Sequence, residues 1–222
     1  MSEPAREARH RLRRIPDRAR YERTDLHAVL DAGFLAHVGF ASAEQPFVLP
    51  MLYWRDGDDL LLHGSIASRL MGALGTGIPA CVTVTHVDGL VLARSHFHHS
   101  VNYRSAVCFG RARLVDAPAD KAAALAHFVD AVLPGRAAEA RPADRNELAA
   151  THVLRMPIED ASVKIRAGGA RDDKADLALP HWAGVVPLAL RPQRPLPEAE
   201  CRDSPLPPSV QRLLDAPSEH TP

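Results

Sequence analysis

The sequence predicts a mainly β protein, with an antiparallel sheet that closes into a β-barrel and a few helices around it. Strand-rich segments, in which apolar and β-branched side chains recur, occupy residues 34–42, 45–64, 79–95 and 103–117. The Asp-Gly pairs in RDGDD and VDGL mark turns between or within these segments. Few helices separate the strands, and this order favours an antiparallel barrel over a parallel, doubly wound sheet.

The chain begins with an expected surface arm and a short helix. Residues 1–23 contain many arginines with acids between them and no aromatic residues suited to base stacking, so we expect no nucleic-acid contact. Residues 24–33, TDLHAVLDAG, predict an amphipathic helix with Thr24 or Asp25 as its N-cap and Gly33 as its stop. The strands of the barrel follow directly.

Three further helices and an irregular end are expected. A helix is predicted over residues 66–74, another over 118–133, where apolar residues recur at helical spacing after a proline, and a short one over 146–152. Residues 151–168 form the last strand-like segment, which alternates imperfectly across a proline. Residues 191–222 are proline-rich and predict an arm or a disordered tail, because prolines prevent regular strand pairing.

Composition limits the class of protein. The chain has 222 residues, 46% of them hydrophobic, enough for the core of one sizeable domain, which we place at residues 24–190. Basic and acidic residues number 27 each, so no net charge attracts nucleic acid or an anionic membrane. Cys81, Cys108 and Cys201 form no CxxC pair, which favours the cytoplasm. Neither a signal-peptide pattern nor a membrane-spanning apolar run is visible, so we expect no membrane association.

An anion-binding segment is predicted at LLHGSIASRL, residues 61–70, where a strand ends and a helix begins. If the strand ends near His63, the side chains of Ser65, Ser68 and Arg69 converge on a helix N-terminus, which favours a negative group of phosphate size. Neither GxxxxGK[ST] nor a GxGxxG after a strand is present, so a nucleoside triphosphate or a Rossmann dinucleotide is not expected. A simple helix cap at Ser65 with a solvated Arg69 is the alternative.

A second polar segment is SHFHHSVNYRSAVCFG. His96, His98 and His99 suggest metal ligands, but no carboxylate or cysteine lies at a suitable local spacing, so no metal ion is expected in this turn between strands. Three polar side chains open the next strand, where they can face a polar ligand: Tyr103, Arg104 and Ser105. The sequence has no GxSxG motif, and a Ser-His-Asp hydrolase is not expected.

The order of FVLPMLYW, LLLHGSIASRL, CVTVTH, VNYRSAVCFGRARLV and a helix beginning PADKAAAL resembles the pyridoxamine 5′-phosphate oxidase-like group of FMN-binding split β-barrels. Within this group the chain is most similar to the flavin-nucleotide-binding branch, which is related to the nitroimidazole-resistance reductases. The similarity extends over residues 18–188, from DRARYER to LPHWAGVVPL. It implies an FMN-binding oxidoreductase that acts on a small molecule at a flavin site between the subunits of a homodimer.

The resemblance also assigns roles to residues. It implies that the anion is the FMN 5′-phosphate, held by Ser68 and Arg69 with His63 and Ser65 nearby. A strand over residues 47–51 would run along the isoalloxazine and offer backbone groups from Val48, Leu49, Pro50 and Met51. Tyr103, Arg104 and Ser105 match the strand that closes over the flavin from the same or the partner chain, and Trp182 is a candidate to stack near the ring or at the dimer seam.

The catalytic residues stay open. His98 and His99 are candidates to donate hydrogen bonds or relay protons at the flavin face, and surface histidines without such a duty are the alternative. A reductase that uses the deazaflavin F420, or a haem-handling relative with histidines on iron, is a further possibility within the same fold. A non-catalytic flavin-binding or redox-sensing module is another. Vitamin B6 oxidation is not expected, because the family's C-terminal Arg-x-x-x-Pro ending is replaced by a proline-rich tail.

Overall fold

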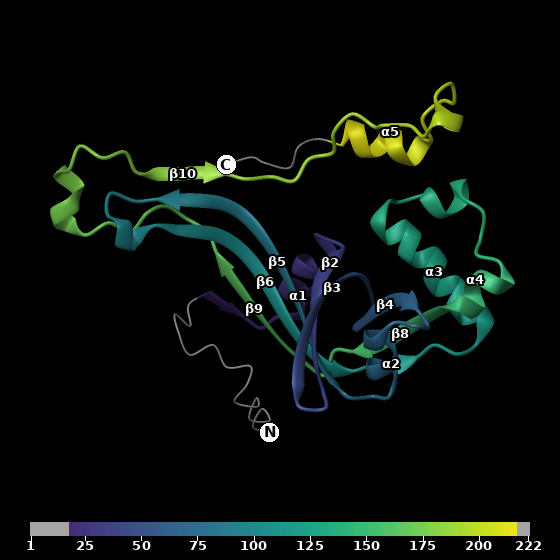
Figure 1. The fold of residues 1–222 in the computed structure, drawn as a ribbon. Helices are drawn as coiled ribbons and strands as arrows, with labels where there is room; N and C mark the ends of the chain where they lie inside the picture. Colours follow the sequence, from purple (N-terminus) through teal and green to yellow (C-terminus); the bar gives the residue numbers. More distant parts are fainter. Residues whose placement is uncertain (1–17, 217–222) are drawn as a thin grey trace.

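The computed structural model describes residues 18–216 (Figure 1). The strands are β1 (Ala19–Arg20), β2 (Leu35–Ser42), β3 (Gln45–Asp56), β4 (Asp59–Ser65), β5 (Pro79–Leu92), β6 (Ser100–Arg111), β7 (Arg113–Leu114), β8 (Thr151–Pro157), β9 (Asp160–Arg166) and β10 (Gly184–Pro187). The α-helices are α1 (Arg23–Asp31), α2 (Arg69–Gly75), α3 (Pro118–Val132), α4 (Arg145–Ala150) and α5 (Pro208–Asp215). Short 3₁₀ helices are η2 (His96–His98), η3 (Arg136–Glu139), η4 (Lys174–Ala178) and η5 (Ala199–Cys201).

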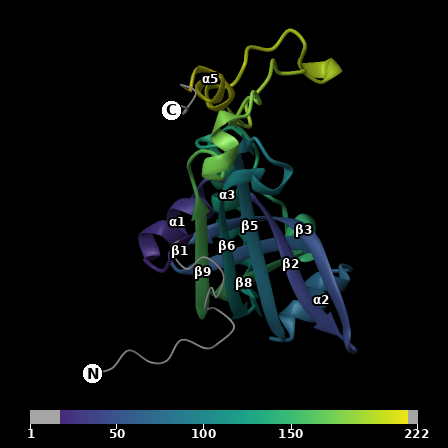
Figure 2. The same cartoon turned by 90° about the vertical axis from the view of Figure 1, so that its left-hand side faces the viewer.

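The strands form one antiparallel sheet in the order β1-β9-β6-β5-β2-β3-β4-β8-β7, and β10 pairs with β5. Figure 2 shows β9, β6, β5 and β2 running side by side. This arrangement confirms the predicted fold class of an antiparallel split barrel with a few helices. The expected closure of the barrel does not occur, because within residues 18–216 no ladder joins β1 to β7.

The core lies inside the curved sheet and is covered by two helices. Leu26, Val29 and Leu30 of α1 are buried there, as the helical spacing of residues 24–33 predicts, although the N-cap is Glu22 rather than Thr24 or Asp25. A second, smaller cluster lies between α3 and the outer face of β4, and its buried members are Trp54, Leu61, Ala124 and Val153. The helices predicted over residues 66–74 and 118–133 are therefore α2 and α3, each of which covers one face of the sheet.

The two Asp-Gly sequences differ in what they do. In RDGDD, Gly57 has a φ of +61° and forms the turn between β3 and β4, as predicted. In VDGL, the chain does not turn: β5 continues through it with a bulge between Val87 and Gly89. A Cβ atom at Gly89 would lie 3.1 Å from the carbonyl oxygen of Val186. The glycine therefore admits the backbone of β10, and the predicted turn at VDGL is wrong.

The segment over residues 151–168 consists of two strands rather than one. β8 ends at Pro157, which lacks the N–H that continued pairing needs, and β9 then pairs with β6 on the other side of the barrel. The helix predicted over residues 146–152 ends earlier, at Ala150. Its N-terminus carries a capping box. The side chain of Asp144 accepts the backbone N–H of Glu147, and the side chain of Glu147 accepts the backbone N–H of Asp144.

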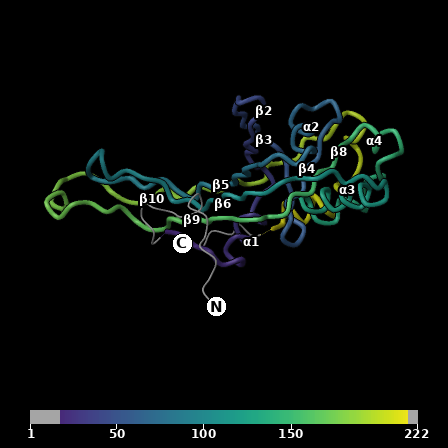
Figure 3. The backbone as a smooth tube through the Cα atoms, turned by 90° about the horizontal axis from the view of Figure 1, so that it is seen from below, coloured from purple at the N-terminus to yellow at the C-terminus, as the bar shows by residue number. Residues whose placement is uncertain are grey.

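A long arm and a C-terminal tail extend from the barrel. Beyond the barrel, β5 and β6 continue as a hairpin with η2 at its tip and β10 along its side (Figures 1 and 3). The tail then runs back to α5, where the N–H and the Oγ–H of Ser209 donate to Glu139 at 3.0 and 2.5 Å. α5 is not predicted from the proline-rich sequence of residues 191–222. Residues 1–17, most of the predicted N-terminal arm, and 217–222 lie outside the described part.

Helices of the described chain are too short or too polar to cross a bilayer.

Candidate functional site

β3 has one edge that no other strand covers. Residues 45–52 pair with β2, from Ser42 opposite Gln45 to Leu35 opposite Leu52, whereas pairing with β4 starts only at Tyr53. In the part of the chain that the structure describes, the second edge of residues 45–52 belongs to no ladder. The backbone groups of this segment that face away from β2 are therefore available to a planar ligand, although Pro46 and Pro50 have no N–H to donate.

The β4–α2 corner carries the two predicted serines. Ser68 caps α2, and its Oγ accepts the N–H of Met71 at 3.5 Å. The Oγ of Ser65 accepts the N–H of Ala67 at 3.2 Å. Ser68 is thus the residue that caps α2, and not Ser65, which the alternative interpretation placed there. Both hydroxyl oxygens act as acceptors in these bonds, and each hydroxyl keeps a proton that it can donate to an anion.

Arg69 links this corner to β3. Its side chain is exposed, and no carboxylate within residues 18–216 forms an ion pair with it. The guanidinium carbon lies 5.4 Å from the ring centroid of Phe47 on β3, a cation–π distance. The other side of the corner also reaches β3, since a Cβ atom at Gly64 would lie 3.9 Å from Cε of Met51. Val48 to Met51, Ser65, Ser68 and Arg69 therefore belong to one surface.

His63 does not share that surface. Its ring lies 4.3 Å from the Phe128 ring of α3 and 6.0 Å from the Trp54 ring. Burial lowers its pKa, which favours the neutral imidazole at neutral pH. The structure thus places His63 in the cluster under α3.

The strand-opening triplet of β6 is also separate from the corner in one chain. Tyr103, Arg104 and Ser105 pair with residues 85–87 of β5 and 164–166 of β9, whereas α2 packs on β4, β7 and β8. Arg104 donates two hydrogen bonds to Asp88, at 3.0 and 2.9 Å, and these bonds raise the pKa of the guanidinium. Within one chain, Arg104 is committed to a neighbouring carboxylate rather than to a ligand.

The remaining candidates lie on the arm. Trp182 is 66% exposed and packs beside Gly184, the residue of β10 that pairs with Leu92. At the tip, Nε2 of His98 lies 3.4 Å from a carboxylate oxygen of Asp173, and Nδ1 of His99 lies 2.9 Å from the carbonyl oxygen of Ser95. One chain does not bring these side chains to the β3 edge. Among the described residues, no three His, Cys, Asp or Glu side chains are grouped to hold a metal ion.

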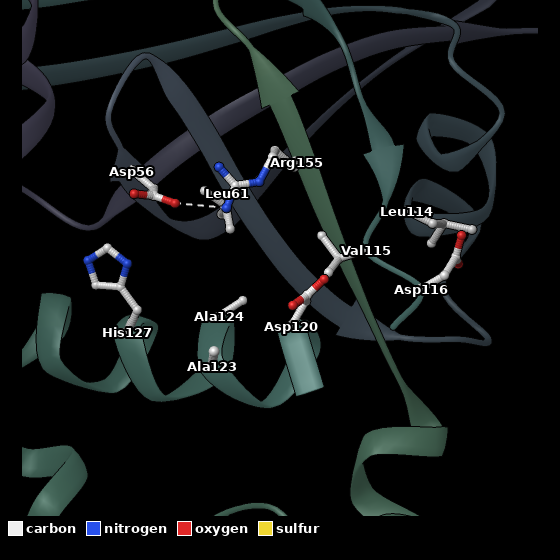
Figure 4. A pocket seen from close by; sticks show the side chains of 10 residues that line it. All are labelled: Asp56, Leu61, Leu114, Val115, Asp116, Asp120, Ala123, Ala124, His127 and Arg155. Carbon is white, nitrogen blue, oxygen red and sulfur yellow. Dashed lines mark hydrogen bonds and ion pairs between the residues drawn. The ribbon is translucent and has the colours of Figure 1, made fainter. Parts of the chain in front are cut away.

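Two cavities lie elsewhere, and local sequence patterns indicate neither. One, of about 460 Å³, lies between α3 and strands β4 and β8 (Figure 4). Arg155 crosses it and donates to Asp56 and Asp59 at 2.7 Å each, which raises the pKa of Arg155. Figure 4 shows His127 on α3 facing the side where Asp56 lies. Arg155 and Asp56 are 99 positions apart in the chain, so no motif signals their contact.

The larger cavity, of about 810 Å³, lies between the barrel and the tail. Its walls include Phe34, His37, His86, Arg104, Leu190 and Leu213. His86 is fixed there, because its Nε2 donates to the carbonyl oxygen of Val29 at 2.9 Å. The cavity depends on the path of residues 188–216, which no local sequence signal predicts.

The fold and the corner together define an antiparallel split barrel in which an exposed arginine and two serine hydroxyls adjoin a free strand edge. The family model described as pyridoxamine 5′-phosphate oxidase matches residues 22–165. The chain belongs to this family, as the order of its motifs predicts. No curated protein matches the chain.

Solved structures extend the comparison. The flavocytochrome Anf3 from Azotobacter vinelandii is 40% identical, with a TM-score of 0.86 over 93% of this chain and 96% of that one. The FAD and haem binding protein from Mycobacterium smegmatis is 39% identical, with a TM-score of 0.85 over 88% of this chain and 97% of that one. A proposed 5-nitroimidazole antibiotic resistance protein from Bacteroides thetaiotaomicron shares the fold at 19% identity, with a TM-score of 0.54 over 66% and 86% of the chains.

Proposed function

We propose that this chain is a flavin-dependent redox protein that binds FAD at the β3 edge and the β4–α2 corner, and haem as a second cofactor. The observation that carries the flavin proposal is the uncovered edge of β3 next to Arg69, a cation without a carboxylate partner in the described chain. The phosphate of a flavin and the polar edge of its ring need these two features at once: a positive charge and a row of free backbone groups.

Different residues of the site hold different parts of the flavin. Arg69 neutralises phosphate charge, and Ser65 and Ser68 donate their hydroxyl protons to phosphate oxygens. The backbone groups of residues 48–51 that face away from β2 orient the ring system, and Pro50 has only a C=O group to offer. When bound, the flavin supplies hydride or electron transfer to a small molecule, while this chain supplies binding and orientation.

The choice of FAD rests on a relative. The family resemblance implies FMN, whereas the Mycobacterium smegmatis protein, at 39% identity, is named for FAD and haem. FMN and FAD both carry phosphate on the ribityl chain, so the corner suits either one. The haem proposal has the same support, since the name of the Azotobacter vinelandii relative also denotes a haem-containing flavoprotein.

The site is proposed to be completed in a homodimer. Tyr103, Arg104, Ser105 and Trp182 lie away from the corner in one chain, yet the family resemblance places such residues over the flavin. These residues would reach the flavin if they came from a second copy of the chain. A small-molecule substrate would then reach the flavin at the boundary between subunits.

Calorimetric titration of the flavin-free chain with FAD and, separately, with FMN tests this function. We expect tighter binding of FAD. Tighter binding of FMN would replace FAD by the flavin of the family resemblance, and absence of binding by both would overturn the proposal. Steady turnover of NADPH or NADH by the loaded protein would mark an oxidoreductase, whereas a flavin that stays oxidised with both donors would favour a binding or sensing module.

A further inference from the structure

The imidazole of His99 is held in an orientation suited to an iron ligand. Its Nδ1 lies 2.9 Å from the carbonyl oxygen of Ser95. A carbonyl oxygen only accepts, so Nδ1 carries the proton and Nε2 has a free lone pair. Histidines that bind metals commonly donate their other ring N–H to a backbone carbonyl in this way, which fixes the tautomer and the direction of the ring. His99 is exposed, so the lone pair is accessible.

Three other histidines of the described chain have Nε2 engaged by a neighbouring group: His27, His86 and His98. In His86 the bond to Val29 engages Nε2 and leaves Nδ1, the ring nitrogen next to the residue's own Cβ. A porphyrin is wide and flat, and ligation through Nδ1 would press that Cβ against it. The Nε2 atoms of His27 and His98 face carboxylates, at 3.1 Å from Asp58 and 3.4 Å from Asp173.

The arm around His99 has exposed apolar side chains, and hydrogen bonds between Arg94 and Asp172 hold its tip in place. Phe97 is 89% exposed and Trp182 is 66% exposed, so large apolar side chains stand free on the same arm. The tip is clamped by Arg94, whose backbone N–H and guanidinium donate to Asp172 at 2.9 and 2.7 Å. The side chain of Asp172 is only 2% exposed. Because the carboxylate of Asp172 is buried and accepts two hydrogen bonds, it keeps the turn that carries His99 in one conformation.

We propose that Nε2 of His99 is the axial ligand of the haem iron. The proposal rests on the haem binding proposed above and adds to it the residue that holds the metal. The bond from Nδ1 to Ser95 also raises the basicity of the imidazole as a ligand.

The experiment compares His99→Ala with His96→Ala in the full chain, produced in cells supplied with haem. His96 is the matched control, because it is also exposed and lies three residues away in the same turn. We expect the Soret absorbance per protein to fall by more than about tenfold in His99→Ala, since losing even an outer partner of a ligand costs that much in metal affinity. His96→Ala should retain its haem, and added imidazole should restore a ligated spectrum in His99→Ala.

Flavin content and melting temperature show whether His99→Ala is folded. If it is not, His99→Cys serves instead, because a thiolate ligand changes the spectrum of the ferrous carbon monoxide complex. An unchanged Soret band in His99→Ala, or an unchanged carbon monoxide spectrum in His99→Cys, would overturn the proposal while leaving haem binding intact. A wild-type chain that holds flavin but no haem would instead remove the haem part of the proposed function, and the ligand assignment with it.

Discussion

At the scale of single residues, the proposed flavin site depends on a cation that has no carboxylate partner among the described residues. Three arginines of the barrel are committed to carboxylates: Arg55 to Asp31, Arg104 to Asp88, and Arg155 to Asp56 and Asp59. Arg69 has an aromatic ring beneath it instead. A phosphate at this corner would meet a guanidinium that loses no ion pair on binding it.

Replacing Arg69 by Ala should weaken flavin binding. A hydrogen bond to a charged group is worth about 1.5–3 kcal/mol, which corresponds to a dissociation constant raised by about 10-fold to 150-fold. Calorimetric titration measures this change. Arg145→Ala is the control, because Arg145 is equally exposed, carries the same charge and begins α4 away from β3. If the affinity of Arg69→Ala equals that of the control, Arg69 is not part of the site.

The thiols of Cys81 and Cys108, whose pKa values are raised by burial, predict a loss of folding stability at alkaline pH. Burial raises the pKa of Cys108 to about 12 and also raises that of Cys81. A thiol in the unfolded chain ionises near pH 8.5, so the stabilisation is complete below that pH and is lost as the pH rises toward the folded pKa. Urea unfolding at pH 8 and pH 10 should show a fall of about 1–2 kcal/mol from Cys108.

Two variants separate this effect from general alkaline damage. Cys108→Ala should show a smaller fall between the two pH values, because the buried thiol is gone. Cys201→Ala removes an exposed thiol and should leave the fall unchanged. Equal falls in Cys108→Ala and the wild type would rule out Cys108 as its source.

At the scale of elements, the β2–β3 hairpin has an unusual turn at the end of β3, the strand proposed to bind the flavin. Ser42 pairs with Gln45, so the loop has two residues, Ala43 and Glu44, with φ angles of +48° and +67°. Such turns favour Asn-Gly, because L side chains are disfavoured at positive φ. This is why no turn signal stands in the sequence here, although the flanking alternation of apolar residues predicts both strands.

Relieving this turn should stabilise the fold. Glu44→Gly removes a side chain from a left-handed conformation that costs about 1–2 kcal/mol, so we expect a gain near 1 kcal/mol after the entropy cost of glycine. The midpoint of urea unfolding measures it. Glu44→Ala is the matched control, since it removes the charge and keeps the Cβ atom. A gain of the same size in both variants would mean that the charge, rather than the backbone, was the cause.

Elements and candidate residues were predictable to different extents. Alternation predicted the barrel strands, and Pro118 with its apolar spacing predicted α3, because these signals are local. The pairing of Gly89 with β10 and the docking of α5 on Glu139 depend on contacts across the molecule. The same holds in the candidate site: the distance between Arg69 and Phe47 of β3 depends on tertiary packing, and His63 packs under α3 because its strand face meets that helix.

At the scale of the whole molecule, the arm and the uncovered face of β2 and β3 are incomplete in one chain. Val48 is 65% exposed and Leu35 is 50% exposed, and Leu35 stands opposite Leu52, which is 39% exposed. Apolar side chains gathered on one face mark an interaction surface.

We therefore predict a dimer in solution, with twice the mass of the chain in sedimentation equilibrium. Leu35→Glu should weaken it, because a charge would be buried against an apolar face. Leu196→Glu is the control, since Leu196 is 92% exposed and lies in the tail. A monomer with full flavin occupancy would contradict both the dimer and the shared site.

The absorption spectrum of the purified chain, recorded again after FAD is added and the unbound fraction removed, shows whether the chain binds flavin. We expect two flavin bands in the near-ultraviolet and blue that remain with the protein, and a Soret band when haem is supplied. A colourless protein that retains no flavin would contradict this expectation. The split barrel would stand, but the corner at Arg69 would need another anion, with F420 as the next ligand to try.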